Sequence, residues 1–147
     1  MVEVLRSDWL TQGPKVREFE SALAAYAGAK HAVMFSSGTT ALQAAYFAAG
    51  IGVGDEIVTS PLTFVATANA AAWQGATPVF ADVEDDTGNL DSQAAAGSIM
   101  PRTKAVVPVH FAGRPADVKA FEALARERGL VLDRGRLPCT WGVVRRP

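Results

Sequence analysis

The sequence predicts an α/β fold, with a mostly parallel sheet that carries helices on both faces. Short apolar segments typical of buried strands alternate with segments whose apolar residues recur at helical spacing. Repeated strand-helix units of this length build parallel sheets covered by helices. With 147 residues, of which 49% are hydrophobic, the chain is long and apolar enough to bury a core.

The predicted helices have turn and cap residues at their ends. In the first, apolar residues from Val16 to Tyr26 are spaced by three or four positions, and Pro14 suits the first turn. The second is so rich in alanine that we expect it to pack closely on its neighbours, and Gly50 follows its end. The predicted helices cover residues 14–26, 41–49, 64–74, a segment from about 92, and 116–128.

The predicted strands are short apolar runs bounded by polar or glycine-containing turns. No internal repeat or low-complexity linker separates them, so we expect one domain over residues 1–132. The strands cover residues 31–35, 56–59, 77–81, 105–109 and 130–132, and residues 82–91 form a polar loop.

Charge and hydropathy exclude several classes of protein. The 14 basic and 15 acidic residues are interspersed and give a net charge of −1, which argues against nucleic acid or a membrane surface as the partner. No apolar run approaches the roughly 20 residues of a transmembrane helix, and the N-terminus lacks the apolar core of a signal peptide. We therefore expect a cytoplasmic protein. The single cysteine, Cys139, rules out an internal disulfide, and no metal site is predicted.

The turn from Ser36 to Thr40 (SSGTT) is the first candidate for a ligand-binding site in the sequence. A helix that begins directly after a strand presents unpaired backbone N–H groups and the positive end of its dipole, and small hydroxyl residues there add donors for a phosphate. Serine and threonine are also the usual N-caps of helices, so plain capping is the alternative. The turn has neither the Walker pattern nor the spaced glycines of a dinucleotide site.

Phe64 and His110 follow two other predicted strands. In a parallel sheet the strand-to-helix turns lie at the carboxyl edge, where ligands bind. Phe64 could stack on a flat ring there, although an ordinary core phenylalanine fits the same position. His110 is a candidate for catalysis, but a lone histidine more often has a structural role.

The motifs of the chain follow a recognisable order: TQGPKVREFESALAAYAGAKHAV, SSGTTAL, GVGDEIVTSPLTFVATANA, GATPVFADVEDDTGNLD and RTKAVVPVHFAGRPADV. In order and spacing they resemble the DegT/DnrJ/EryC1/StrS family of pyridoxal-phosphate-dependent sugar aminotransferases. The resemblance runs without a gap from about Asp8 to Leu132. TSPLTFVATANA and VPVHFAG are most similar to the branch that acts on UDP-4-keto-6-deoxy-N-acetylhexosamines, as in pseudaminic acid precursor synthesis.

This resemblance implies the type I fold of pyridoxal-phosphate transferases, of which the chain would form a truncated large domain. It implies that Gly38 and Thr39 hold the cofactor phosphate and that Phe64 stacks on the pyridine ring. Thr11 and Gln12 match a segment that approaches the nucleotide-sugar substrate, with Gln12 in place of a commoner small hydroxyl residue. Members of the family are homodimers that transfer an amino group, typically from glutamate, to a nucleotide-linked 4-ketosugar in polysaccharide or glycan precursor biosynthesis.

Two groups that pyridoxal chemistry requires cannot be assigned in this chain. The family has a carboxylate for the pyridine nitrogen in a Glu-Asp-Ala motif and a lysine for the Schiff base further on. Asp133 lies too early for that carboxylate and lacks the motif around it. We therefore expect no catalytic residue and no activity of the chain alone. The lysines match surface or helix positions of the family: Lys15, Lys30, Lys104 and Lys119.

The segment 133–147 (DRGRLPCTWGVVRRP) breaks the strand-helix pattern, and we expect an out-of-frame, disordered tail. One permissible coding of Asp133 to Arg146, read one base later, gives TEDASHALGASYG, which contains the absent motif. If the sheet were cut short in this way, Val106, Val107, Val109 and the strand 130–132 would lose their cover. The alternatives are a non-catalytic remnant that binds a phosphate ligand, a half enzyme that pairs with a separately encoded C-terminal half, and an unrelated nucleotide-binding module.

Overall fold

The computed structural model describes the backbone of residues 1–136 and 141–145 and the side chains of residues 1–132. Two compact units make up the chain, Met1–Phe35 and Ser36–Pro147. Among the helices described, none combines the length and the apolar character needed to cross a membrane.

The first unit contains α1 (Val2–Leu5) and α2 (Pro14–Ala27). The bounds of α2 agree with the predicted helix 14–26, because Pro14 occupies its first turn and Gly28, with a φ of 62°, ends it in the left-handed conformation. Glu20 Oε1 accepts a hydrogen bond from the backbone N–H of Met34 at 2.9 Å, which ties the following segment back to the helix.

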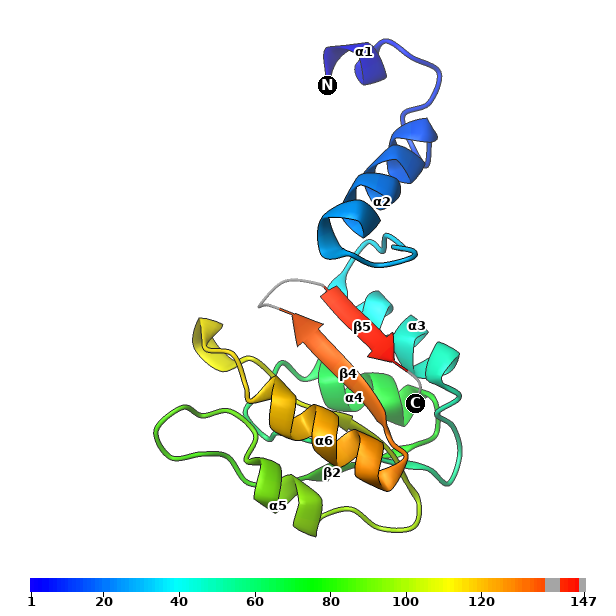
Figure 1. The fold of residues 1–147 in the computed structure, drawn as a ribbon. Coiled ribbons are helices and arrows are strands. Elements are labelled where there is room, and N and C mark those ends of the chain that lie inside the picture. The colour runs from blue at the N-terminus through cyan, green and yellow to red at the C-terminus, as the bar shows by residue number, and fades with distance from the viewer. Residues whose placement is uncertain (137–140, 146–147) are drawn as a thin grey trace. The chain divides into compact units, whose positions relative to one another are not determined.

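The second unit is built on a five-stranded sheet of order β2-β1-β3-β4-β5. Figure 1 shows β4 and β5 side by side in this sheet. The pairs β1–β2, β1–β3 and β3–β4 are parallel, as predicted, and β4–β5 is antiparallel. The strands are β1 (Glu56–Thr59), β2 (Thr77–Phe80), β3 (Thr103–Val107), β4 (Val131–Arg136) and β5 (Trp141–Arg145).

Residues 31–35 do not form a strand, contrary to the prediction. The described strands of the sheet pair only with one another, so the backbone of this segment has no ladder partner among them. An apolar run becomes a strand only when another strand satisfies its N–H and C=O groups. Val33 remains 65% exposed and Phe35 41% exposed.

Helices cover both faces of the sheet, and each face has its own core. Neighbouring residues of β1 pack into different cores, because successive side chains of a strand point to opposite faces of the sheet. Ile57 packs with Tyr46 and Ala70 from α3 and α4, whereas Val58 packs with Phe121 and other residues of α5 and α6. The helices are α3 (Gly38–Ala49), α4 (Ala66–Trp73), α5 (Ser92–Gly97) and α6 (Val118–Arg128).

The C-terminal segment differs from the expected disordered tail in the part that the structure describes. β4 continues to Arg136, and β5 pairs with it from Trp141 to Arg145. An antiparallel neighbour satisfies backbone groups that β4 would otherwise leave unpaired at the sheet edge. Cys139 lies outside the described residues.

Most of the apolar residues that we expected to lose their cover are buried, whereas Val109 and Val131 are half-buried. Val106 is 0% exposed, Val107 is 3% exposed and Leu132 is 4% exposed. They belong to the two helix-covered cores, so helices of this same chain provide the cover that we had attributed to absent strands.

Candidate functional site

The segments with Phe64 and His110 follow neighbouring strands at the carboxyl edge of the sheet. β1 and β3 are neighbours and end at the same level, because Thr59 pairs in register with Val107. The buried Thr59 hydroxyl also donates a hydrogen bond to the Val107 carbonyl at 2.8 Å. The segment with Phe64 and the segment with His110 therefore leave the sheet from adjacent strand ends.

The first turn of α3 combines a capped end with further N–H donors. Ser37 is the N-cap, since its Oγ accepts a hydrogen bond from Thr40 N at 3.3 Å, and Thr40 Oγ1 donates to the Ser37 carbonyl at 2.9 Å. The capping interpretation is thus confirmed for Ser37. Gly38 and Thr39 are half-buried in the first turn, where backbone N–H groups have no carbonyl partner within the helix. An anion fits these donors and the positive end of the helix dipole.

Phe64 lies just before α4 and is 73% exposed. The alternative of an ordinary core phenylalanine is therefore wrong, and the ring is accessible to a ligand. The segment before it is ordered by its own hydroxyl groups, because Ser60 Oγ accepts from Leu62 N at 3.0 Å. Thr63 Oγ1 and Thr67 Oγ1 lie 2.9 Å apart and share a hydrogen bond.

A hydrogen bond in the core joins α3, which begins at Gly38, to α4, which Phe64 precedes. Tyr46 Oη, on α3, donates to the carbonyl of Thr67, on α4, at 3.1 Å. Gln74 Nε2 donates to the Gln43 carbonyl at 3.4 Å at another point of the same contact. The helix that Gly38 and Thr39 begin therefore packs against the helix that Phe64 precedes. No local pattern in the sequence predicts this role of Tyr46.

Thr11 and Gln12, the predicted substrate residues, belong to the unit Met1–Phe35 and are exposed. Gln12 has a φ of 50°, a backbone conformation that non-glycine residues rarely adopt. They are in a different unit from Gly38, Thr39 and Phe64.

His110 has a structural partner. Its Nδ1 accepts a hydrogen bond from Ala116 N at 3.0 Å, which places the proton of the neutral ring on Nε2. The bond closes the loop that follows β3.

All four lysines of the chain, Lys15, Lys30, Lys104 and Lys119, are exposed.

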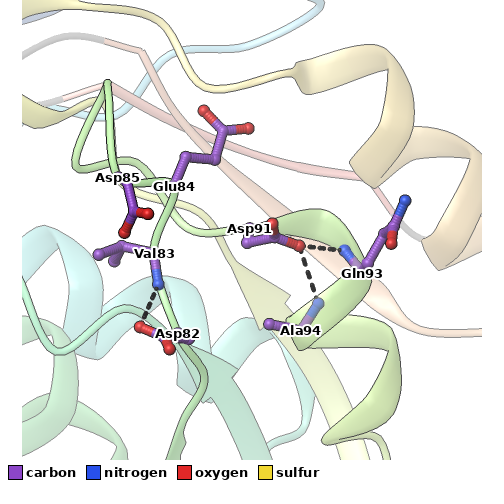
Figure 2. Close-up of a pocket in the computed structure, with 7 residues that line it drawn as sticks. All are labelled: Asp82, Val83, Glu84, Asp85, Asp91, Gln93 and Ala94. Atoms are coloured by element: carbon purple, nitrogen blue, oxygen red, sulfur yellow. Dashed lines mark hydrogen bonds between the residues drawn. The ribbon is translucent and has the colours of Figure 1, made fainter.

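An acidic hollow lies beyond the end of β2 (Figure 2). Asp91 Oδ1 caps α5 by accepting from Gln93 N at 2.7 Å and Ala94 N at 2.9 Å, and Asp82 Oδ1 accepts from Val83 N at 2.8 Å. The negative charge disfavours a phosphate here. In the described part of the chain, no cluster of His, Cys, Asp and Glu is arranged to hold a metal ion. The hollow is lined by Asp82, Val83, Glu84, Asp85, Asp91, Gln93 and Ala94.

Comparisons with known proteins agree with this arrangement. Residues 1–133 match the DegT/DnrJ/EryC1/StrS aminotransferase family. The chain is 53% identical over 130 residues to the spore coat polysaccharide biosynthesis protein SpsC of Bacillus subtilis (strain 168), covering 88% of this chain and 33% of that protein. It therefore spans about a third of the length of this relative.

Solved structures of similar proteins share the fold. DesV of S. venezuelae, in complex with a ketimine intermediate, has a TM-score of 0.84 and 40% identity over 89% of this chain and 35% of its own. NtdA of Bacillus subtilis, with bound cofactor PMP, has a TM-score of 0.80 and 31% identity over 83% of this chain and 28% of its own. The α/β fold with a parallel sheet is thus the fold of pyridoxal-phosphate-dependent aminotransferases.

Proposed function

Because the chain belongs to the DegT/DnrJ/EryC1/StrS aminotransferase family, we propose that it carries the phosphate-binding and ring-stacking part of a pyridoxal-phosphate-dependent sugar aminotransferase. The observation that supports this most directly is the packing of α3, which begins at Gly38 and Thr39, against α4, which Phe64 precedes. The proposed parent reaction transfers an amino group, typically from glutamate, to a nucleotide-linked 4-ketosugar. The spore coat polysaccharide relative supports a place in polysaccharide or glycan precursor biosynthesis.

The residues present fit the phosphate and the ring of the cofactor. The first turn of α3 supplies backbone N–H groups, and the Thr39 hydroxyl adds a donor of the kind that a phosphate dianion accepts. Phe64 offers an exposed aromatic face, 73% accessible, on the neighbouring helix segment. When bound, pyridoxal phosphate supplies the electron sink and carries the amino group.

In this proposal each residue has a separate task. Gly38 and Thr39 anchor the phosphate, which fixes one end of the cofactor. Phe64 covers one face of the pyridine ring, excludes water from it and keeps it in one orientation. Thr11 and Gln12 contribute to the nucleotide-sugar site, for which we propose a UDP-linked 4-keto-6-deoxy-N-acetylhexosamine. A cytoplasmic location, a homodimer and the absence of membrane or nucleic-acid partners stay predictions from the sequence.

We expect the chain alone to be inactive. No lysine or carboxylate can be given the family's catalytic roles, and the four lysines are exposed on the surface of the described chain. A partner chain that supplies these groups would make the chain half of a split enzyme. The alternative is a non-catalytic remnant that binds a phosphate ligand. A downstream coding frame for the lysine portion would support the split enzyme, and its absence would support the remnant.

The experiment is a titration of the chain with pyridoxamine 5′-phosphate, followed by calorimetry or tryptophan fluorescence. Phe64→Ala should weaken binding by about 1–3 kcal/mol, because a stacking partner is lost. Thr39→Ala should weaken it by about 1–3 kcal/mol, because a charge-assisted hydrogen bond to the phosphate is lost. Phe47→Ala is the matched control, since Phe47 is an aromatic residue of α3 with similar exposure, 75%.

Equal binding by the Phe64→Ala, Thr39→Ala and unaltered chains would show that the cofactor residues are wrongly assigned. A loss in Phe47→Ala as large as in Phe64→Ala would mean that the measured effect comes from exposed aromatic surface in general.

A further inference from the structure

Asn89 is a buried amide that joins two loops. It is 2% exposed and lies in the turn that precedes α5. Its Oδ1 accepts a hydrogen bond from Phe111 N at 2.8 Å, and its Nδ2 donates to the Pro115 carbonyl at 3.3 Å. Both ends of one side chain thus hold the loop after β3, which is more than twenty residues away in sequence.

The loop from His110 to Ala116 is held in an unusual conformation. Ala112 has a φ of 49° and Gly113 a φ of 83°, so two successive residues are in the left-handed region. For alanine this conformation is unfavourable, and it persists only where the surroundings enforce it. The bond from Ala116 N to His110 Nδ1, at 3.0 Å, closes the loop at its base.

Further contacts fix the same loop to the turn that contains Asn89. Gly88 lies against the Phe111 ring so closely that a Cβ at this position would be 2.8 Å from Phe111 Cδ1. Arg114 Nη1 donates to the Asp86 carbonyl at 3.3 Å, and Arg114 Nη2 lies 3.5 Å from Asp86 Oδ2. The Arg114 contacts are exposed, so we attribute the local order mainly to the buried Asn89.

We propose that the loop 110–116 is a preformed rim of the ligand-binding edge and that Asn89 is its positioning residue. The loop follows β3, the neighbour of β1, and therefore leaves the sheet beside the strand end from which the Phe64 segment leaves. The buried amide of Asn89 holds the strained backbone of the loop in one conformation. A loop that is already fixed suits a ligand-binding edge, because it loses no conformational entropy when the ligand binds. The proposal rests on the proposed function, since it takes the cofactor as the ligand.

The first test measures amide hydrogen exchange in the chain. In Asn89→Leu and, at neutral pH, in Asn89→Asp, the protection of the Phe111 and Ala116 amides should fall by about tenfold or more, because the acceptor or donor is lost. The amides of the core strands β1 and β3 should stay within about twofold of their protection in the unaltered chain. Gln93→Glu, an exposed amide-to-acid change nearby, is the control for Asn89→Asp.

Acid supplies a rescue that is specific to the hydrogen bond with the Pro115 carbonyl. Protonating the carboxyl group in Asn89→Asp restores a donor for the Pro115 carbonyl, so loop protection should recover relative to the unaltered chain at the same pH. Unchanged loop protection in both variants at neutral pH would overturn the role of Asn89. So would an equal loss of protection at loop and core amides, because Asn89 would then act only on global stability.

The second test needs no variant and links the loop to the ligand. Pyridoxamine 5′-phosphate added to the unaltered chain should shift the amide resonances of Phe111 to Gly113 together with those of Thr39 and Phe64. Shifts at Thr39 and Phe64 without shifts in the loop would overturn the rim and leave the proposed function intact. Absence of shifts at Thr39 and Phe64 would overturn the proposed function and, with it, the rim, whereas the exchange result would still decide the role of Asn89.

Discussion

Tyr46 Oη donates a hydrogen bond to the carbonyl of Thr67 at 3.1 Å in the core between α3 and α4. Tyr46 is 1% exposed and Thr67 6% exposed, so water does not compete for this bond. Thr67 lies three residues after Phe64, and the backbone N–H of Thr67 also donates to the Phe64 carbonyl at 3.0 Å. The placement of Phe64, the proposed stacking residue, relative to the helix of Gly38 and Thr39 is therefore set from within the core.

Tyr46→Phe should lower the free energy of unfolding by about 1 kcal/mol, because it removes the donor and leaves a buried carbonyl without it. Urea unfolding followed by circular dichroism measures the change. Tyr26→Phe is the matched control, since Tyr26 is 92% exposed and the same atom is removed with an expected effect below about 0.5 kcal/mol. Equal stability of the two variants would mean that the bond between the helices contributes nothing.

Arg102→Leu should lower the free energy of unfolding more than the same substitution of an arginine in an exposed ion pair. Arg102 Nη2 contacts Glu56 Oε1 at 2.6 Å, and the Glu56 side chain is only 8% exposed. Among the described residues, Glu56 Oε2 has no hydrogen-bond partner, so this carboxylate depends heavily on the guanidinium. We expect a loss of about 1–3 kcal/mol in the free energy of unfolding.

Arg114→Leu is the control for that measurement. Its ion pair with Asp86 is solvent-exposed, with side chains 59% and 74% accessible, and such pairs contribute at most about 1 kcal/mol. A smaller effect for Arg102→Leu than for Arg114→Leu would contradict the dependence of buried Glu56 on its partner.

The sequence predicted those features that depend on local pattern. Helix α2 and strand β1 have the expected bounds or nearly so, because periodicity, Pro14 and turn glycines act within a few residues. Residues 31–35 were predicted wrongly, since a strand requires a partner that no local pattern specifies. Asn89 escaped notice because an asparagine in a polar loop resembles any turn residue, and its burial depends on a loop far along the chain.

The candidate site was predictable only in part for the same reason. The resemblance to the family implied Gly38, Thr39 and Phe64 as cofactor residues, and the exposure of Phe64 removes the alternative of a core residue. The rule for parallel sheets applies to Phe64, which follows β1, but not to Gly38 and Thr39, because residues 31–35 before them form no strand. The assignment of His110 to structure needed the hydrogen bond from Ala116, which is six residues away but formed only by the folded loop.

Borohydride reduction of the chain with pyridoxal phosphate should give no stoichiometric adduct at a single lysine. All four lysines are exposed and none has an assigned role, so any labelling should be slow and distributed. Peptide mass mapping of the reduced protein reports the sites. Complete labelling of one lysine, or measurable transaminase turnover, would contradict the expected inactivity of the chain.

A one-base change near codons 132 and 133 should restore the family motif if segment 133–147 is frameshifted. The repaired frame should encode a Glu-Asp pair after Leu132, and extension through a downstream lysine should give a protein that binds pyridoxal phosphate and absorbs visible light. Nucleotide sequencing across codons 130–147 and beyond decides the matter first. A sequence whose shifted frame lacks this motif would rule the frameshift out.

The antiparallel pairing of β5 with β4 also affects how the sheet could grow. With β5 in place, a partner chain that added a parallel strand beside β4 would first have to displace β5, because a strand edge accepts one neighbour at a time. Assembly would then proceed by strand exchange, with a rate limited at high partner concentration by release of β5. Removing β5 would convert this slow, concentration-independent phase into ordinary second-order association.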